Sequence, residues 1–129
     1  MIEKIDHIVL TVSSIDKAKE FYEQILGLSV VEFAKDRFAI TLENQKINLH
    51  TVNTEAIPKA QNPSLGSFDI CFTTSWSLSK VKEHLEKHRI DIIEYDVERI
   101  GANGVLKSLY IYDFDGNLLE ISNKVSSNN

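Results

Sequence analysis

Four side chains of types that commonly bind metal ions stand out in this sequence: His7, His50, Asp69 and Glu120. Two imidazoles together with a carboxylate suit the divalent ions of manganese, iron, cobalt, nickel and zinc. A protein-bound metal with open coordination positions can act as a Lewis acid on an oxygen atom of a substrate. Chemistry of this kind requires the fold to bring these side chains to one place.

Each of the four candidates lies in a segment where apolar and other side chains alternate. Such alternation is typical of a β-strand with one buried face, because successive side chains point to opposite faces of the sheet. The apolar neighbours that point the other way are Ile8, Leu49, Ile70, Leu119 and Ile121. We therefore expect all four candidates on the faces of the sheets that point away from the helices.

The elements that would carry these residues are predicted in the same order twice. In the first copy the strands are residues 5–12, 29–34, 38–43 and 46–52. In the second copy they are residues 67–74, 90–97, 105–112 and 117–123. An amphipathic helix follows the first strand of each copy, with its apolar stripe at 18–26 and at 78–85. The chain therefore reads as two β-α-β-β-β modules, which belong to the α+β class.

An alignment of the two copies pairs the candidate positions with one another. His7 falls over Asp69, and His50 falls over Glu120. If each module curls its sheet, these positions line a concave cavity. Module one is predicted at residues 4–53, a linker at 54–66 and module two at 67–123. One domain would span residues 1–124, and the polar residues 125–129 are expected to form a disordered tail.

Four further residues bear on function. His84 and His88 are four residues apart on the second predicted helix, a spacing that can bind metal, but we interpret them as surface histidines. Ser108 and Tyr110 share the alternation of the cavity face. Their hydroxyls can either hydrogen-bond a substrate or line a half-polar wall.

Composition excludes several classes of partner. The chain has 129 residues, 43% of them hydrophobic, and a formal net charge of −5. No stripe of Lys and Arg is present to bind nucleic acid, and no apolar run is long enough to span a membrane. The single cysteine cannot form an internal disulfide, and no signal peptide is evident at the N-terminus. We expect a cytoplasmic protein with a small-molecule substrate.

At these residues the chain resembles the vicinal-oxygen-chelate superfamily, which includes glyoxalases, fosfomycin-resistance proteins and extradiol dioxygenases. The resemblance covers about residues 4–123 and is closest to small bacterial virulence-associated and glyoxalase-domain-containing proteins. The matching motifs are IDHIVLTV at 5–12, KINLH at 46–50 and YIYDFDGNLLEI at 110–121.

The resemblance implies that each module forms a curved, incomplete mixed-sheet barrel, with one metal in the central cavity. It assigns His7, His50 and Glu120 as metal ligands, and Asp69 as a further candidate where many relatives have histidine. Asp69 would then either ligate through oxygen or orient a ligand or a water molecule. The implied cofactor is a divalent ion, with Zn, Ni, Mn, Co and Fe as candidates.

The resemblance also implies activities. The favoured one is a metal-dependent lyase or isomerase of the glyoxalase type, in which Glu120 is the catalytic carboxylate that transfers a proton. The alternatives are a metal-free protein that binds a small molecule or drug, and an extradiol-type dioxygenase. Relatives of this kind are expected to be homodimers, formed either side by side or by exchange of modules.

Overall fold

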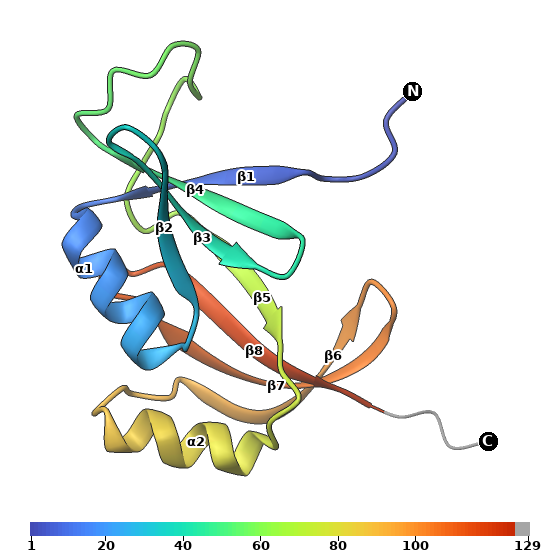
Figure 1. The fold of residues 1–129 in the computed structure, drawn as a ribbon. Helices are drawn as coiled ribbons and strands as arrows, with labels where there is room; N and C mark the ends of the chain where they lie inside the picture. The colour runs from blue at the N-terminus through green and yellow to red at the C-terminus, as the bar shows by residue number, and fades with distance from the viewer. Residues whose placement is uncertain (126–129) are drawn as a thin grey trace. The chain divides into compact units, whose positions relative to one another are not determined.

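The computed structural model describes residues 1–125. The chain divides into two compact units, Met1–Gly66 and Ser67–Asn129 (Figure 1). The predicted disordered tail falls mainly on residues 126–129, which lie outside the described residues. Each unit consists of a four-stranded sheet with helix on one face.

Unit 1 has its strands in the order β1-β4-β3-β2. Strand β1 runs parallel to β4, and the other neighbours are antiparallel. Helix α1 continues directly into a π-helical segment, η1. The bounds are β1 (His7–Val12), α1 (Ile15–Lys19), η1 (Glu20–Ile25), β2 (Ser29–Ala34), β3 (Arg37–Leu42) and β4 (Gln45–Thr51).

Unit 2 repeats this arrangement with the strand order β5-β8-β7-β6. Strand β5 runs parallel to β8, and the other neighbours are antiparallel. The bounds are β5 (Asp69–Thr73), α2 (Leu78–Lys87), β6 (Glu94–Gly101), β7 (Gly104–Tyr112) and β8 (Leu118–Lys124). The predicted α+β class with two β-α-β-β-β modules and open mixed sheets is therefore confirmed.

One face of each sheet is apolar and buried with the helix of its unit. In unit 1 the buried side chains include Leu10, Val12, Ile40, Ile47 and Leu49 of the strands, with Ala18, Phe21 and Tyr22 of the helix. In unit 2 they include Leu109, Ile111, Leu119 and Ile121, with Leu78, Val81 and Leu85. This burial follows the predicted alternation and leaves the other face of each sheet for polar residues.

Side-chain caps fix where the helices begin. Ser14 Oγ accepts a hydrogen bond from Lys17 N (3.2 Å), and Ser77 Oγ accepts one from Lys80 N (3.2 Å). These contacts satisfy backbone N–H groups that a first helical turn otherwise leaves without a partner. The helical segment of unit 1 ends before Gly27, whose φ of 70° is readily adopted by glycine.

The predicted strand at residues 90–97 begins four residues too early. In the structure, helix α2 closes first: Arg89 takes a φ of 59°, and Ile90 N donates to Leu85 O (2.9 Å). This closure uses Ile90 as part of the helix terminus, so β6 starts only at Glu94. The isoleucines at 90, 92 and 93 suggested a strand, because the spacing of apolar residues alone does not distinguish a strand from a helix terminus.

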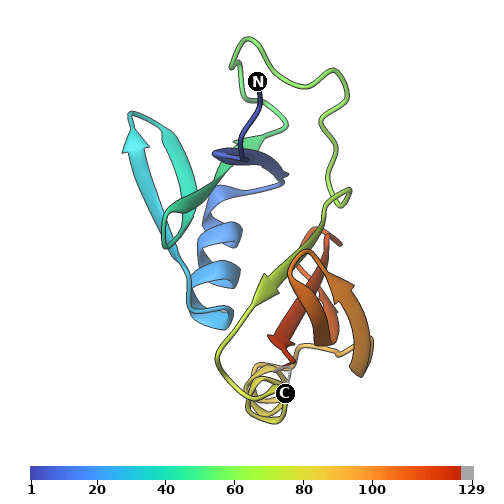
Figure 2. The same ribbon diagram turned by 90° about the vertical axis from the view of Figure 1, so that its right-hand side faces the viewer.

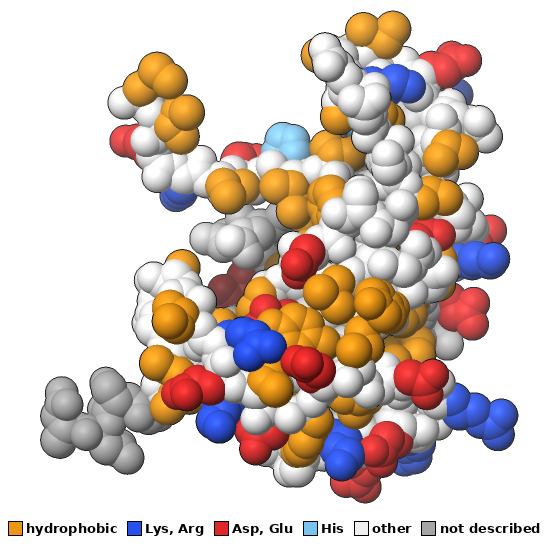
Figure 3. Space-filling model, turned by 180° about the vertical axis from the view of Figure 1, so that it is seen from behind, with side chains coloured by type: hydrophobic (Ala, Val, Ile, Leu, Met, Phe, Trp, Pro, Cys, Tyr) orange, Lys and Arg blue, Asp and Glu red, His pale blue; other side chains and the backbone are white. Residues whose placement is uncertain are grey.

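The segment between β4 and β5 has neither helix nor strand (Figure 2). Within residues 1–125, no helix is long and apolar enough to cross a membrane. On the side drawn in Figure 3, acidic, basic and hydrophobic side chains are interspersed over the surface.

Candidate metal centre

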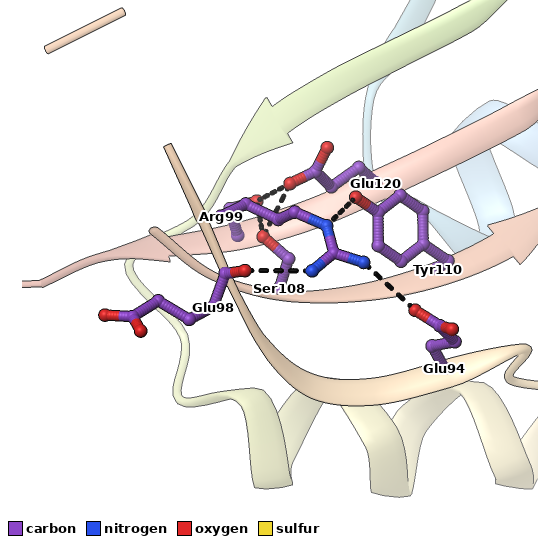
Figure 4. Close-up of polar contacts among 7 residues, drawn as sticks. Glu94, Glu98, Arg99, Ser108, Tyr110 and Glu120 are labelled. Atoms are coloured by element: carbon purple, nitrogen blue, oxygen red, sulfur yellow. Dashed lines mark hydrogen bonds and ion pairs between the residues drawn. The ribbon is translucent and has the colours of Figure 1, made fainter. Parts of the chain in front are cut away.

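Glu120 is held in one orientation by two buried serines of unit 2 (Figure 4). Ser108 Oγ donates to Glu120 Oε2 at 2.6 Å, and Ser122 Oγ donates to the same oxygen at 3.3 Å. The two hydroxyls are also 2.7 Å apart, and both residues are fully buried. A carboxylate has enough lone pairs to accept both hydroxyls and still bind a metal ion. The arrangement therefore holds the Glu120 carboxylate in a defined position and leaves it oxygen lone pairs for a further partner.

Tyr110 lies opposite Glu120 on the neighbouring strand. Its hydroxyl accepts a hydrogen bond from Arg99 Nε (2.9 Å), and Arg99 is also paired with Glu94 at 3.1 Å (Figure 4). Burial raises the pKa of Tyr110, the Arg99 hydrogen bond lowers it, and the charge of Glu120 raises it further. The net direction is upward, so the phenol stays protonated at neutral pH.

These contacts refine the predicted substrate-binding residues. The Ser108 hydroxyl is engaged with Glu120 and Ser122, and the side chain is inaccessible to solvent. In this structure it therefore positions Glu120. Tyr110 is half-buried, and its role in binding substrate stays a prediction.

In unit 1, His7 is oriented by its neighbour Asp6. Asp6 Oδ1 lies 2.8 Å from His7 Nδ1, and this hydrogen bond lowers the pKa of Asp6. A carboxylate on one ring nitrogen fixes the ring and leaves Nε2 for a metal, as in many metal-binding histidines. The sequence pattern around His7 does not distinguish Asp6 for this role.

The strand register corrects the alignment of the two copies. His7 pairs with Lys46, whereas Asp69 pairs with Leu118. Asn48 lies two residues after Lys46 on β4, and Glu120 lies two residues after Leu118 on β8. Asn48 and Glu120 therefore occupy equivalent positions in the two units. The predicted correspondence of His50 with Glu120 is therefore wrong, because it was counted along the sequence and not through the paired strands.

Asn48 is a further candidate ligand, which the sequence pattern does not reveal. Its side chain is 5% exposed, and Oδ1 has no hydrogen-bond partner among the described residues. A buried polar atom without a partner is costly, and an amide oxygen is a suitable ligand for a divalent cation. The motif KINLH at residues 46–50 gives no reason to select Asn48 as a ligand, because an asparagine in a strand does not by itself indicate a functional site.

His50 lies on the same face as His7 but is displaced along the sheet. Its partner on β1 is Thr11, four residues from His7. At about 3.3 Å per residue, this offset amounts to roughly 13 Å along the strands. Asn48 is two residues closer to His7, and we therefore place it ahead of His50 as a ligand. His50 as a ligand stays a prediction.

The pKa of His50 reports on the burial of its side chain and on the charged groups around it. Desolvation lowers its pKa from 6.5, and the charges of Arg37 and Lys59 lower it further. We expect an NMR titration midpoint for His50 below 6.5, and Arg37→Gln should move it upward. Because the folded-state pKa is lowered, the contribution of His50 to stability is present above pH 6.5 and is lost as the pH falls through the folded-state pKa. The exposed Lys19→Gln is the control, and a wild-type midpoint at or above 6.5 would contradict the expectation.

The model of the Glyoxalase/Bleomycin resistance protein/Dioxygenase superfamily matches residues 4–121. The chain belongs to this superfamily. Within the superfamily it is 48% identical, over 97% of its length and 87% of the relative, to virulence protein STM3117 of Salmonella typhimurium. The crystal structure of that protein has a TM-score of 0.92 and covers 97% of this chain and 99% of the other. Glyoxalase domain-containing protein RDO1 of Mycosarcoma maydis is 42% identical over 94% of this chain and 68% of the relative.

Two more distant solved structures share the fold. Lactoylglutathione lyase from Agrobacterium tumefaciens has a TM-score of 0.71 at 22% identity, with 95% of each chain covered. A Glu-to-Gln mutant of the fosfomycin resistance protein FosX from Listeria monocytogenes, in complex with Mn(II) and 1S,2S-dihydroxypropylphosphonic acid, has a TM-score of 0.67 at 20% identity. That match covers 97% of this chain and 93% of FosX.

The candidate ligands of this superfamily member are divided between its two units. His7, Asn48 and His50 belong to unit 1, and Asp69 and Glu120 belong to unit 2. Within residues 1–125, no three His, Cys, Asp or Glu side chains are grouped as a metal site. Within each unit, the donor types are ones that divalent ions accept: an imidazole and a buried amide oxygen without a partner in unit 1, and a positioned carboxylate in unit 2.

A pair of histidines lies at the C-terminal end of α2, His84 within the helix and His88 directly after it. The rings of His84 and His88 have centroids 4.6 Å apart, and that of Trp76 lies 5.7 Å from His84. His88 is exposed and His84 is half-buried. Because two neighbouring imidazoles can bind a metal weakly, this pair has to be removed in any measurement of the main site.

Proposed function

We propose that the protein is a divalent-metal-dependent enzyme of the glyoxalase-like type, a lyase or isomerase that acts on a small oxygenated compound. The observation that carries the proposal is the positioning of Glu120 by the buried hydroxyls of Ser108 and Ser122. Two fully buried serines on one carboxylate hold it in a defined place, as a ligand or proton-transfer group requires. We also propose that it acts in the cytoplasm as a homodimer.

In this proposal His7 and Glu120 are the principal metal ligands, Asn48 and His50 are the candidates for a third ligand, and Asp69 is a further candidate. When bound, the metal would supply Lewis-acid polarisation of a substrate oxygen. Asp6 keeps the His7 ring oriented through Nδ1. Glu120 accepts a proton from the substrate and returns it, and the protonated Tyr110 hydroxyl on the neighbouring strand provides a hydrogen bond near that carboxylate.

Metal binding by purified protein tests the proposal. The measurement is made in a His84→Ala/His88→Ala background, by elemental analysis and by competition with a chromogenic chelator. We expect one tightly bound divalent ion per chain, and a loss of affinity of roughly a hundredfold in His7→Ala, because an imidazole ligand is removed. Asn48→Ala and His50→Ala are compared in the same background, and the larger loss identifies which of the two is the ligand.

Unchanged metal content in His7→Ala would contradict the proposed site. A wild-type protein that binds no divalent ion, but binds a cationic drug tightly, would favour the metal-free binding protein instead. Oxygen uptake with a catechol in the iron-loaded protein would favour the dioxygenase.

A further inference from the structure

The polar face of the unit 1 sheet carries positive charge and no carboxylate. Arg37 and Lys46 belong to this face, because each is an odd number of residues from the paired side chains Ile40 and Ile47, which point toward the helix. The only acidic residue within strands β1 to β4 is Glu32. Glu32 pairs with Phe38, which alternates with Arg37 and so points to the other face. Unit 1 therefore concentrates cations on one side of its sheet.

Phe33 brings these two cations to one place. Lys46 Nζ lies 3.8 Å from the centroid of the Phe33 ring, and Arg37 Cζ lies 5.0 Å from the same centroid. A ring face attracts each cation, but the two like charges repel each other. None of the ion pairs among residues 1–125 includes Arg37 or Lys46. The cluster, defined here as Phe33, Arg37 and Lys46, therefore has uncompensated positive charge.

Asp6 precedes β1, the strand on which His7 pairs with Lys46, but its carboxylate is hydrogen-bonded to His7 and almost fully exposed. A partner for the cluster must therefore come from outside the unit 1 sheet.

The polar face of the unit 2 sheet carries negative charge, in contrast to that of unit 1. Asp69, Glu94 and Glu120 are carried by its strands, and its Arg99 is already paired with Glu94. An anionic ligand is repelled by carboxylates and attracted by uncompensated cations. An anion is therefore favoured on the unit 1 face.

We propose that the cluster of Phe33, Arg37 and Lys46 binds the carboxylate of a small anionic substrate. The planar guanidinium of Arg37 offers paired donors to a carboxylate, and Lys46 adds a second positive charge. Phe33 packs against the apolar part of the same molecule. The assignment of this anion as the substrate rests on the proposed function, whereas the anion site itself does not.

Benzoate is the probe, and benzamide is its neutral counterpart of nearly the same shape. Binding is measured by NMR titration of chelator-treated protein, so that coordination to a metal does not contribute. We expect benzoate to bind, and Arg37→Gln and Lys46→Gln each to weaken it by roughly tenfold, because each removes a charged hydrogen-bond donor. The control Lys19→Gln removes an exposed charge at the end of α1 and should change the affinity by less than about twofold.

Three results would overturn the inference: no binding of benzoate, equal binding of benzamide, or an equal loss in Lys19→Gln. Thermal melting and metal loading of the variants are measured in parallel. Benzoate binding in a protein that takes up no metal would refute the proposed function and support the anion site. Metal loading without benzoate binding would refute the anion site alone.

Discussion

Glu120→Gln is expected to weaken metal binding by roughly a hundredfold or more and to remove activity. The amide keeps the shape of the side chain and still accepts hydrogen bonds from Ser108 and Ser122. It lacks the negative charge that binds a cation, and it cannot accept a proton from a substrate. The loss therefore reports on charge and proton transfer, and not on packing. Competition with a chelator measures the affinity in the His84→Ala/His88→Ala background.

Glu98→Gln is the matched control for this substitution. Glu98 is an exposed carboxylate on β6 of the same sheet, so its replacement makes the same change in net charge. We expect its metal affinity to stay within about twofold of wild type. Equal losses in the two variants would show that general electrostatics explains the effect, and Glu120 would no longer be assigned as a ligand.

Asn117→Ala is expected to lower the free energy of unfolding by about 3 kcal/mol. Asn117 is fully buried, and its side chain joins two parts of unit 2. Nδ2 donates to Asp113 Oδ2 (2.8 Å), and Oδ1 accepts from Phe68 N (2.9 Å) at the start of β5. The substitution leaves a buried carboxylate and a backbone N–H each short of a partner. Urea unfolding followed by circular dichroism measures the change.

The control for Asn117 is Asn62→Ala, because Asn62 is exposed in the segment between β4 and β5. A surface substitution of this kind should change stability by less than about 0.5 kcal/mol. A similar small change in Asn117→Ala would mean that the turn from β7 to β8 does not depend on the buried contact.

Local patterns predicted most of the fold. Alternation of apolar residues located seven of the eight strands to within about two residues at either end, because burial of one face is imposed by the sequence itself. The strand β6 was misplaced because the terminus of α2 uses Ile90, a contact that alternation does not encode.

The candidate site was predicted less completely because it depends on pairing between distant segments. His7 and Glu120 stand in motifs that a single sequence can reveal. Asn48 became a candidate only when β1 was paired with β4, and the contact of Ser108 with Glu120 requires the register of β7 with β8. Such registers are fixed by tertiary packing, which a linear alignment does not contain.

The two units share the same strand pairing, so the side chains of a protein built from two copies of one unit can be predicted. In the register of the two sheets, His50 and Ser122 occupy equivalent positions, as do Asn48 and Glu120. A tandem protein made from two copies of unit 1 would carry imidazoles and cations on both polar faces and no strand carboxylate there. A tandem of unit 2 would carry two copies of Glu120 with their serines and no histidine on those faces. The polar faces of the two units are therefore chemically unlike, and neither unit can replace the other.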